Sequence, residues 1–194
     1  MGKKKSRKGR IVIVSGPSGV GKSTICKQVV QRLDNALLSI SATTRPKSDA
    51  EVDGRDYWFL SEQEFRDRIN RGQFLEHANI FGNWYGTPKD KVDEALQADR
   101  TVILEIDVQG AGQVKALYPD AMMIFILPPS ERVLAERMDH RGRDDDESSE
   151  KRLEGASDEI AAAWQHYKHM VINDDLEQAV NECIQIIQNA ESEV

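Results

Sequence analysis

The chain has 194 residues, 39% of them hydrophobic, and a formal net charge of −7, which is the composition of a globular protein with a substantial core. No apolar run approaches the roughly 18 residues of a membrane span, and no apolar stretch precedes the first predicted strand as in a secretory signal. The two cysteines, Cys26 and Cys183, lie on separate predicted helices, which excludes a disulfide scaffold and indicates buried thiols in a reducing cytoplasm.

Positive charge is concentrated at the start of the chain. Residues 1–10 hold six of the 26 Lys and Arg residues and no acidic residue, so the remainder has 20 basic against 33 acidic residues, a net charge of −13. We interpret residues 1–9 as a basic disordered tail, although such an arm can contact nucleic acid or anionic lipid, and Gly2 with Ser6 fits a myristoylation pattern. The acidic remainder disfavours nucleic-acid polymers. We therefore expect small anionic substrates, with no nucleic-acid polymer and no membrane contact through the tail.

The first predicted element is a strand from Ile11 to Ser15, a mostly β-branched apolar run of the kind buried on both faces of a parallel sheet. The segment GPSGVGKS follows at 16–23 and has the spacing G-x-x-x-x-G-K-[ST] of a phosphate-binding loop. A helix with Ile25, Val29 and Leu33 on one face is predicted next.

A loop of this kind directs its backbone N–H groups and the positive end of the following helix dipole toward a phosphate. The side chain of Lys22 can reach the β- and γ-phosphates, and the hydroxyl of Ser23 can ligate Mg²⁺. The predicted binding site for a nucleoside triphosphate consists of Gly16, Pro17, Ser18, Gly19, Val20, Gly21, Lys22, Ser23 and Thr24.

The α/β alternation is interrupted at residues 38–87 by a segment rich in predicted strands. Its elements are a strand at 37–41, a loop at 46–55, an aromatic strand at 57–60, a helix from about 61 to 71, a strand at 74–80 and a turn at 81–86. Ser61 and Glu64 form a capping box at the start of the helix, and Gly72 ends it. We therefore predict a small lobe inserted into a larger core.

Helices and strands alternate again after residue 87. The predicted elements are a helix at 88–98, a strand at 101–107, a helix at 110–117, a strand at 121–127, a helix to about 140, a charged break at 141–149, a helix at about 150–168, a strand at 170–173 and a helix to about 189. Pro88 lies in the first turn of its helix, and Ser130 caps another.

Strands separated by helices of ten or more residues pair in parallel through right-handed crossovers. We therefore predict an α/β protein: a three-layer P-loop fold with a parallel core sheet, an inserted sheet-rich acceptor-binding lobe and a helical lid. The core would comprise residues 10–37 and 88–194, with a lid at about 138–152, and the lobe residues 38–87. Nucleotides bind at the carboxyl ends of such strands.

Several further segments match one family in colinear order. They are SISATTR at 39–45, GRDY at 54–57 with Phe59, FLE at 74–76, GNWYGT at 82–87, IDVQG at 106–110 and VINDD at 171–175. Together with the phosphate-binding loop, they resemble the guanylate kinases of the P-loop nucleoside monophosphate kinase superfamily over nearly the whole chain outside the tail. The resemblance implies Mg²⁺-dependent transfer of phosphate from ATP to GMP or dGMP, giving ADP and the diphosphate. We expect a cytoplasmic monomer or homodimer.

The resemblance also assigns the acceptor site. Glu76 matches the carboxylate that accepts the ring N–H and the exocyclic amine of guanine, and adenine lacks this ring N–H. Ser41 and Thr87 match hydroxyl groups that contact the base. Arg45 can hold the acceptor phosphate with two hydrogen bonds, and two tyrosine hydroxyls add donors. The predicted GMP site consists of Ser41, Arg45, Tyr57, Glu76, Tyr85, Thr87 and Asp107.

Phosphoryl transfer between two nucleotides needs alignment and charge neutralisation rather than a covalent intermediate. By resemblance, three arginines reach the transferring phosphates from the lid side, and Asn173 contacts the adenine of the donor. Asp107 would orient Mg²⁺-bound water or the acceptor, with Glu105 nearer the sheet. The predicted catalytic residues are Lys22, Arg45, Arg137, Arg141, Arg152 and Asp107, and the predicted metal contacts are Ser23 and, through water, Asp107.

The chain departs from the family in one loop. Relatives usually read T-T-R-x-x-R-x-G-E, whereas this chain has Ser48 in place of the second arginine and Ala50 in place of the glycine. We expect weaker GMP binding or a rearranged loop without loss of the reaction, because Lys47 is one position off and lacks the guanidinium fork.

Two alternatives belong to other functional classes. A catalytically weak guanylate-kinase-like module could use the acceptor site to bind phosphorylated peptides, but such modules typically lack a working phosphate-binding loop. Another P-loop kinase or hydrolase would have no need of Glu76 and the segment 39–45.

Overall fold

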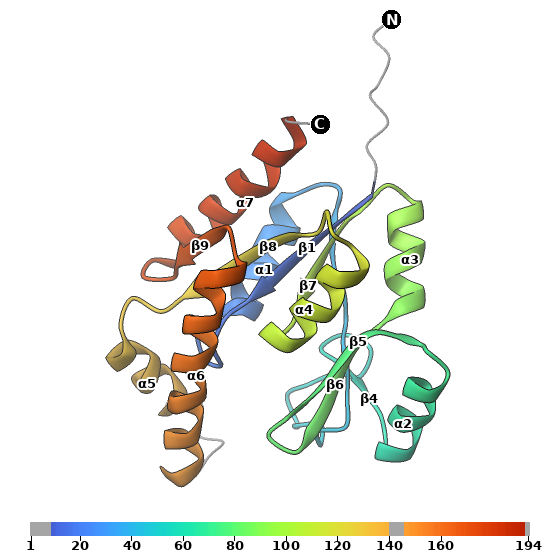
Figure 1. Cartoon of the computed structure of the whole chain (residues 1–194), viewed down its shortest axis with the longest axis horizontal. Coiled ribbons are helices and arrows are strands. Elements are labelled where there is room, and N and C mark those ends of the chain that lie inside the picture. The colour runs from blue at the N-terminus through green and yellow to red at the C-terminus, as the bar shows by residue number, and fades with distance from the viewer. Residues whose placement is uncertain (1–8, 140–145, 193–194) are drawn as a thin grey trace, which may run out of the picture.

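The computed structural model describes residues 9–139 and 146–192 and places a parallel sheet at the centre of the molecule (Figure 1). The strand order is β2-β7-β1-β8-β9, and all four strand pairs are parallel. The strands are β1 (Arg10–Ser15), β2 (Ala36–Leu38), β7 (Thr101–Glu105), β8 (Met122–Leu127) and β9 (His169–Ile172). Each pair needs a crossover, so helices cover both faces of the sheet and the strands are buried on both sides.

Alternate residues of β1 face two separate hydrophobic clusters. Val12 and Val14 pack with α1 and α7 on one face, and Ile11 and Ile13 pack with α3, α4 and α6 on the other. The helices are α1 (Lys22–Arg32), α3 (Lys89–Gln97), α4 (Val108–Leu117), α6 (Asp146–His166) and α7 (Leu176–Ser192). The predicted three-layer α/β fold is therefore confirmed, with a core on each side of the sheet.

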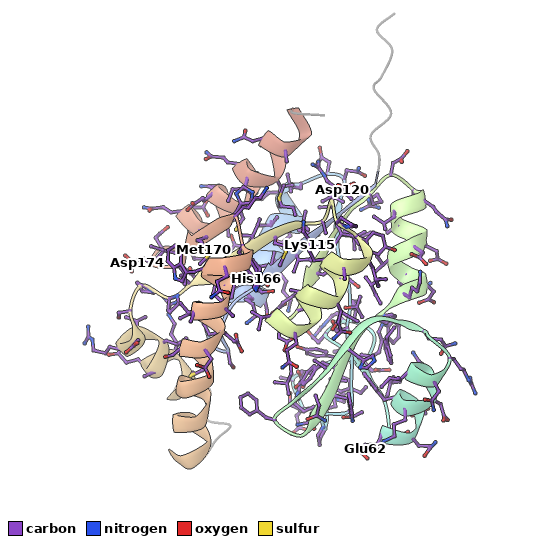
Figure 2. All side chains as sticks on the ribbon, in the orientation of Figure 1. Glu62, Lys115, Asp120, His166, Met170 and Asp174 are labelled. Atoms are coloured by element: carbon purple, nitrogen blue, oxygen red, sulfur yellow. The ribbon has the colours of Figure 1, made fainter. Side chains whose placement is uncertain are left out.

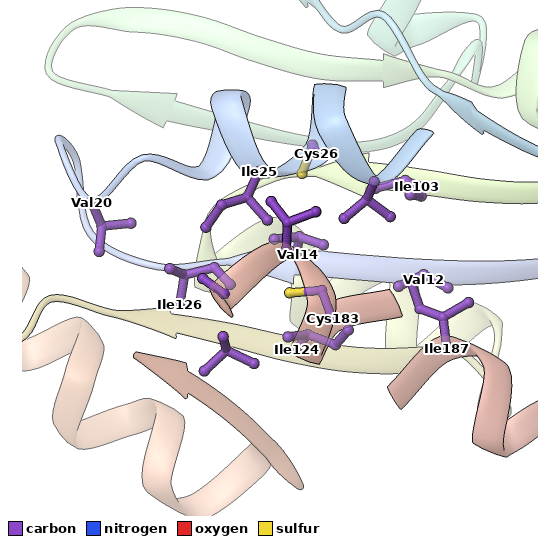
Figure 3. Close-up of a cluster of buried hydrophobic side chains, with 14 of the residues drawn as sticks. Val12, Val14, Val20, Ile25, Cys26, Ile103, Ile124, Ile126, Cys183 and Ile187 are labelled. Atoms are coloured by element: carbon purple, nitrogen blue, oxygen red, sulfur yellow. The ribbon is translucent and has the colours of Figure 1, made fainter. Parts of the chain in front are cut away.

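The two cysteines are buried in the first of these clusters (Figure 3). Cys26 on α1 and Cys183 on α7 are free thiols, and burial raises the pKa of both. They act as small apolar side chains, as the sequence predicts.

A second, smaller sheet lies beside the core, below it in the view of Figure 1. Its order is β4-β3-β6-β5; β3 and β4 are parallel, whereas β6 is antiparallel to both of its neighbours. The strands are β3 (Ala42–Thr43), β4 (Trp58–Phe59), β5 (Phe74–Ile80) and β6 (Asn83–Pro88), and α2 (Glu62–Asn70) covers them. Phe65 of α2 stacks on Phe74 at a centroid distance of 4.4 Å and fills a small core of its own. The predicted capping box of Ser61 and Glu64 is confirmed.

Two predictions in this region were wrong. The strand expected at 37–41 is divided between β2 and β3, because the chain leaves the core sheet after Leu38 and joins the small sheet at Ala42. The turn expected at 81–86 is confined to Phe81 and Gly82, which have φ angles of 48° and 81°, and β6 begins at Asn83. Trp84 and Tyr85 are therefore strand residues.

Several predicted helix ends shift by a few residues. Helix α1 begins at Lys22, directly after the glycine-rich loop, and α4 begins at Val108 because Asp107 is its N-cap. Helix α6 begins at Asp146, inside the predicted charged break. The element before it is α5 (Glu131–Asp139). Residues 140–145, in the middle of the predicted lid at 138–152, lie outside the described residues. Of the helices described, none is both long and apolar enough to cross a membrane.

Candidate functional site

The phosphate-binding loop lies at the carboxyl edge of the core sheet, between β1 and α1. Gly21 is the N-cap of α1 with a φ angle of 101°, and among the described residues no side chain caps this helix. The first N–H groups of α1 are thus available to an anion. Gly16 approaches the carbonyl oxygen of Ile126 so closely that a Cβ atom there would collide with it. Glycine is needed at 16 for space and at 21 for backbone conformation.

The lysine and serine of the loop contact its backbone and a neighbouring strand. Lys22 Nζ donates hydrogen bonds to the carbonyl oxygens of Gly16 (2.5 Å) and Pro17 (2.9 Å). Ser23 Oγ donates to Glu105 Oε1 at 2.5 Å, which joins the loop to the end of β7. A hydroxyl beside a carboxylate is a donor set that suits Mg²⁺ carried by a nucleotide. The described residues contain no group of three or more His, Cys, Asp or Glu side chains that could hold a metal on their own.

Asn173 and Arg137 link the loop to two other elements. Asn173, which directly follows β9, donates from Nδ2 to the carbonyl oxygen of Val20 at 2.8 Å. Arg137 in the last turn of α5 donates from Nη2 to the carbonyl oxygen of Asn173 at 3.0 Å, while its Nη1 is buried without a hydrogen-bond partner. An unpartnered guanidinium nitrogen at this place suits an anion.

The second half of the site is built around the buried carboxyl group of Glu76, which is 4% exposed. Its Oε1 accepts a hydrogen bond of 2.7 Å from Thr87 Oγ1 on the paired strand β6. Gly110 of α4 leaves room for the other oxygen, since a Cβ atom there would collide with Glu76 Oε2. Asp107 Oδ1 accepts from the N–H of Gly110 at 2.8 Å and so caps α4 beside the same carboxyl group.

These carboxyl groups have raised pKa values. Burial raises the pKa of Glu76 to about 7 against the hydrogen bond from Thr87, and the nearby Asp107 adds to the increase. Burial also raises the pKa of Asp107, which the N–H of Gly110 and the charge of Lys22 counteract. Asp107 therefore lies within electrostatic reach of both Lys22 and Glu76 and connects the two halves of the site.

Arg45 is held in place by a carboxylate and two aromatic rings. Its guanidinium donates to Glu51 at 2.6 and 3.1 Å, and the side chains of the pair are 22% and 14% exposed. The same group lies 5.5 Å from the ring centroid of Tyr57 and 5.8 Å from that of Phe59. The hydrogen bonds from Arg45 lower the pKa of Glu51 to about 2.

Two tyrosines lie next to this guanidinium. Tyr57 and Tyr85 are edge-to-face neighbours with ring centroids 6.0 Å apart, and Tyr85 contributes to the raised pKa of Arg45 after the larger effect of Glu51. Burial, with Glu105 as the next cause, raises the pKa of Tyr57 to about 12, so its hydroxyl remains a donor at neutral pH.

The loop that departs from the family closes on the same carboxylate. Ser48 donates to Glu51 Oε2 from both its N–H (2.9 Å) and its Oγ (2.8 Å). Lys47 Nζ donates to the carbonyl oxygens of Ser48 (3.2 Å) and Glu51 (3.0 Å), so it binds its own loop.

The predicted residues lie at the carboxyl edge of the core sheet and in the neighbouring small sheet, with some exceptions. Ser41 lies between β2 and β3, where its carbonyl oxygen accepts from the N–H of Trp58. Arg141 lies outside the described residues, and so do the side chain of Arg152 and the tail at residues 1–8.

Sequence reasoning assigned no role in the site to Glu51 or to Glu159 of α6. Burial raises the pKa of Glu159 to about 7, and Lys22 and Asp107 are close enough to affect it. Glu51 could have been found from its spacing to Arg45, whereas no local signal marks Glu159, because only the packing of α6 brings it to the site.

The site can therefore hold two anions. The glycine-rich loop with Lys22 offers donors to one of them, and Arg45 with the two tyrosines offers donors to the other. Asp107 lies within electrostatic reach of Lys22 and of the buried carboxyl group of Glu76. This is the arrangement needed to transfer a phosphoryl group between two bound molecules.

Comparison with known proteins gives one consistent family. The guanylate kinase family model matches residues 8–190. A guanylate kinase of Carboxydothermus hydrogenoformans is 51% identical over 176 residues, which are 90% of this chain and 85% of that protein. A guanylate kinase of Synechocystis is 45% identical over 182 residues, 94% of this chain and 95% of that one. The crystal structure of a guanylate kinase from Anaplasma phagocytophilum superposes with a TM-score of 0.79 at 29% identity, covering 96% of this chain and 87% of the other.

The burial of Glu76 predicts a pH-dependent cost in stability. Because its pKa is raised from 4.5 to about 7, the folded protein binds this proton more tightly than the unfolded chain, and stability falls as the pH rises from about 4.5 to 7. The full shift corresponds to about 3 kcal/mol. Glu76→Gln retains an acceptor for Thr87 and does not ionise. We expect this variant to unfold at a higher Tm than the wild type at pH 8, with a smaller difference at pH 5.

Glu62→Gln on the exposed start of α2 is the matched control (Figure 2), with an expected Tm within a degree or two of the wild type, as is usual for surface substitutions. Equal gains in Tm for Glu76→Gln at pH 5 and pH 8 would contradict the assigned pKa.

Proposed function

Because this chain belongs to the guanylate kinase family and phosphorylates GMP at the expense of ATP, we propose that the residues described above form its donor and acceptor sites. The observation that carries this assignment is the buried carboxyl group of Glu76, placed across Asp107 from the phosphate-binding loop. A hydrolase would use water at this position and would have no need of a desolvated carboxyl group to bind a base.

The donor site is the loop at residues 16–24 with the first turn of α1. Its N–H groups and Lys22 bind the phosphates of ATP, and binding moves Lys22 Nζ from the loop carbonyl oxygens to phosphate oxygens. Mg²⁺ that enters with ATP neutralises phosphate charge. Ser23 would ligate this metal, and Glu105 and Asp107 would hold its water molecules. Asn173 would contact the adenine side of the donor.

The acceptor site reads guanine by its two N–H donors. Ionised Glu76 accepts from the ring N–H and from the exocyclic amine, while Thr87 retains its hydrogen bond to Oε1. Adenine presents no ring N–H at this position, so it leaves a buried carboxylate without its partner. Ser41 completes the set of polar groups proposed to contact the base.

The phosphate of GMP is proposed to bind at Arg45. Both terminal nitrogens of its guanidinium donate to Glu51, and one of them also donates to the carbonyl oxygen of Pro46. Its charge lies beside Tyr57 and Tyr85, and a phosphate there would be held by this charge together with the tyrosine hydroxyls. Tyrosine hydroxyls complete the contacts without adding charge. One guanidinium with two hydroxyls is a weaker grip than the two arginines usual in the family.

Transfer then proceeds in line, with no covalent intermediate on the protein. Lys22 and the unpartnered Nη1 of Arg137 neutralise the charge that develops on the transferring phosphoryl group. Asp107 aligns the acceptor beside it. Arg141 and Arg152 are proposed to join from the lid, and closure of lobe and lid would exclude water as a competing acceptor.

We infer further that the enzyme acts in the cytoplasm, which the two buried free thiols support, since a reducing compartment keeps thiols unpaired. A monomer or a homodimer, with residues 38–87 as the GMP-binding lobe, remains our proposal for its organisation.

The acceptor assignment predicts strict base selectivity. In a coupled assay of ADP release from MgATP, we expect rapid turnover with GMP and at least about 100-fold lower kcat/KM with AMP, CMP and UMP. If ATP binds and no nucleoside monophosphate stimulates release, the catalytic proposal fails, and binding of phosphorylated peptides becomes the next measurement.

The loop at residues 45–51, which departs from the family pattern, predicts that one substitution will strengthen the binding of GMP. Ser48→Arg restores a second guanidinium near the acceptor phosphate, so we expect the KM for GMP to fall by about three- to tenfold with kcat nearly unchanged. Lys47→Arg, which adds a fork one position away without adding charge, is the control and should change the KM by less than about twofold. A KM that stays constant or rises in Ser48→Arg would show that position 48 does not limit GMP binding.

The unpartnered nitrogen of Arg137 predicts a defect in the transfer step. We expect Arg137→Met to lower kcat by on the order of 100-fold, the usual effect of removing one donor to developing charge, with little change in the KM for GMP. Arg132→Met on the same helix, whose side chain is 83% exposed, should retain wild-type kcat. A large rise in the KM for GMP with normal kcat would show that Arg137 contributes to binding of GMP and not to the phosphoryl-transfer step.

A further inference from the structure

Strand β5, which carries Glu76, is an edge strand of the small sheet. One edge of β5 pairs with β6, and no strand within residues 9–139 and 146–192 pairs with the other. Backbone N–H and C=O groups on such an edge need other partners. At His77, the residue after Glu76, that partner is a side chain of the core.

The side chain is Gln113 of α4. Its Oε1 accepts from the N–H of His77 at 3.2 Å, and its Nε2 donates to the carbonyl oxygen of the same residue at 2.8 Å. A primary amide has one acceptor and two donors, so it can replace the peptide group of a neighbouring strand. Contact at two points restrains rotation of the strand at His77, and the ring of His77 packs edge-on against Trp84 on the other side.

Helix α4 presents three consecutive features to the acceptor site. Asp107 caps its start, Gly110 leaves room for the carboxyl group of Glu76, and Gln113, three residues further along the same face, binds the strand. The helix is fixed by the fully buried Ala111 and Val114. Its Lys115, seen in Figure 2, donates to the carbonyl oxygen of Ala121 at 2.7 Å. The residue before Glu76, Leu75, is buried in the core cluster on the same side of the large sheet.

We propose that Gln113 is a positioning residue for recognition of the guanine base: by holding the backbone of His77, it fixes the direction in which the Glu76 carboxylate meets the base. The inference rests on the proposed role of Glu76. It also implies that the strand reading the base is positioned by the core helix α4 rather than by the lobe alone.

The consequence concerns specificity more than rate. Successive side chains of a strand point to opposite faces of the sheet from the same backbone. A rotation of the backbone at His77 therefore moves the carboxylate of the preceding residue, Glu76. A Glu76 carboxylate that is less well positioned can still accept a hydrogen bond from one N–H group of the base. It aligns less well with the ring N–H and the exocyclic amine at the same time. Inosine monophosphate, whose base has the ring N–H and lacks the exocyclic amine, therefore serves as the probe.

The test is steady-state kinetics of Gln113→Met, which keeps the length of the side chain and removes the amide. We expect the KM for GMP to rise by about three- to tenfold, as for one or two lost hydrogen bonds at an exposed site. The ratio of kcat/KM for GMP over inosine monophosphate should fall by a similar factor. The KM for ATP should not change. Gln97→Met at the exposed end of α3 is the matched control, with wild-type values throughout.

Gln113→Glu gives a second, independent measurement, since it retains the acceptor oxygens and loses the donor to His77. We expect a defect of the same kind, which becomes smaller at low pH, where a protonated carboxyl group can donate again. Wild-type selectivity in both variants would overturn the proposal, and so would an equal loss of kcat/KM for GMP and inosine monophosphate. If the wild type and Gln97→Met themselves showed no preference for GMP, the proposed role of Glu76 would fail instead.

Discussion

A carboxyl group that is 4% exposed is costly to ionise, and Glu76 accepts a hydrogen bond from Thr87 while the like charge of Asp107 lies nearby. In the proposed acceptor site, the two N–H donors of guanine would stabilise the charged form of this carboxyl group. On this proposal, burial of Glu76 lowers the stability of the protein without ligand and raises the selectivity for guanine, because a base that lacks those donors does not offset the cost of desolvating the carboxylate. Gly110 leaves room for this buried group, and the hydroxyl of Thr87 donates a hydrogen bond to it.

The carboxyl edge of the parallel sheet brings the second site to the first. Register pairs Val14 of β1 with Glu105 of β7, so the strand that enters the phosphate-binding loop ends beside the strand that leads to Asp107. Helix α4 then begins at that point and reaches the small sheet. Two nucleotides can be aligned because the end of one strand and the start of the next helix are fixed by the same buried packing on both faces of the sheet.

The elements that could be predicted from sequence are those with a local cause. The apolar run Ile11–Ser15, the capping box at Ser61 and the strand Phe74–Ile80 all appear at or within one residue of the expected places. Predictions failed where the tertiary structure decides: the split of 37–41 between two sheets depends on a change of partner at Leu38, and Trp84 became a strand residue because β5 supplies its partner. The same distinction between local signals and tertiary packing holds for the residues of the site. Glycines and Lys22 are marked by spacing, whereas Glu159 and Gln113 reach the site only because whole helices pack against it.

The loop from Arg45 to Glu51 explains physically how a site can work with a reduced number of positive charges. A flexible arginine loses side-chain freedom when it binds a phosphate, and this cost is smaller if the guanidinium is already fixed. Here the Glu51 carboxylate holds Arg45 with two hydrogen bonds, Ser48 holds Glu51 with two more, and two rings flank the guanidinium. Ser48 thus helps to fix the position of the Arg45 guanidinium through Glu51, whereas an arginine at position 48 would add positive charge. This fixed geometry does not fully compensate for the missing second arginine. Glu51 would place a negative charge near the phosphate, and pre-organisation lowers the entropic cost of binding without replacing the lost Coulombic attraction. If GMP binds as proposed, the affinity of the acceptor site would therefore depend more on the contact between the base and Glu76 than on the contact between the phosphate and Arg45. The position of the Glu76 carboxylate would then matter more than that of the guanidinium.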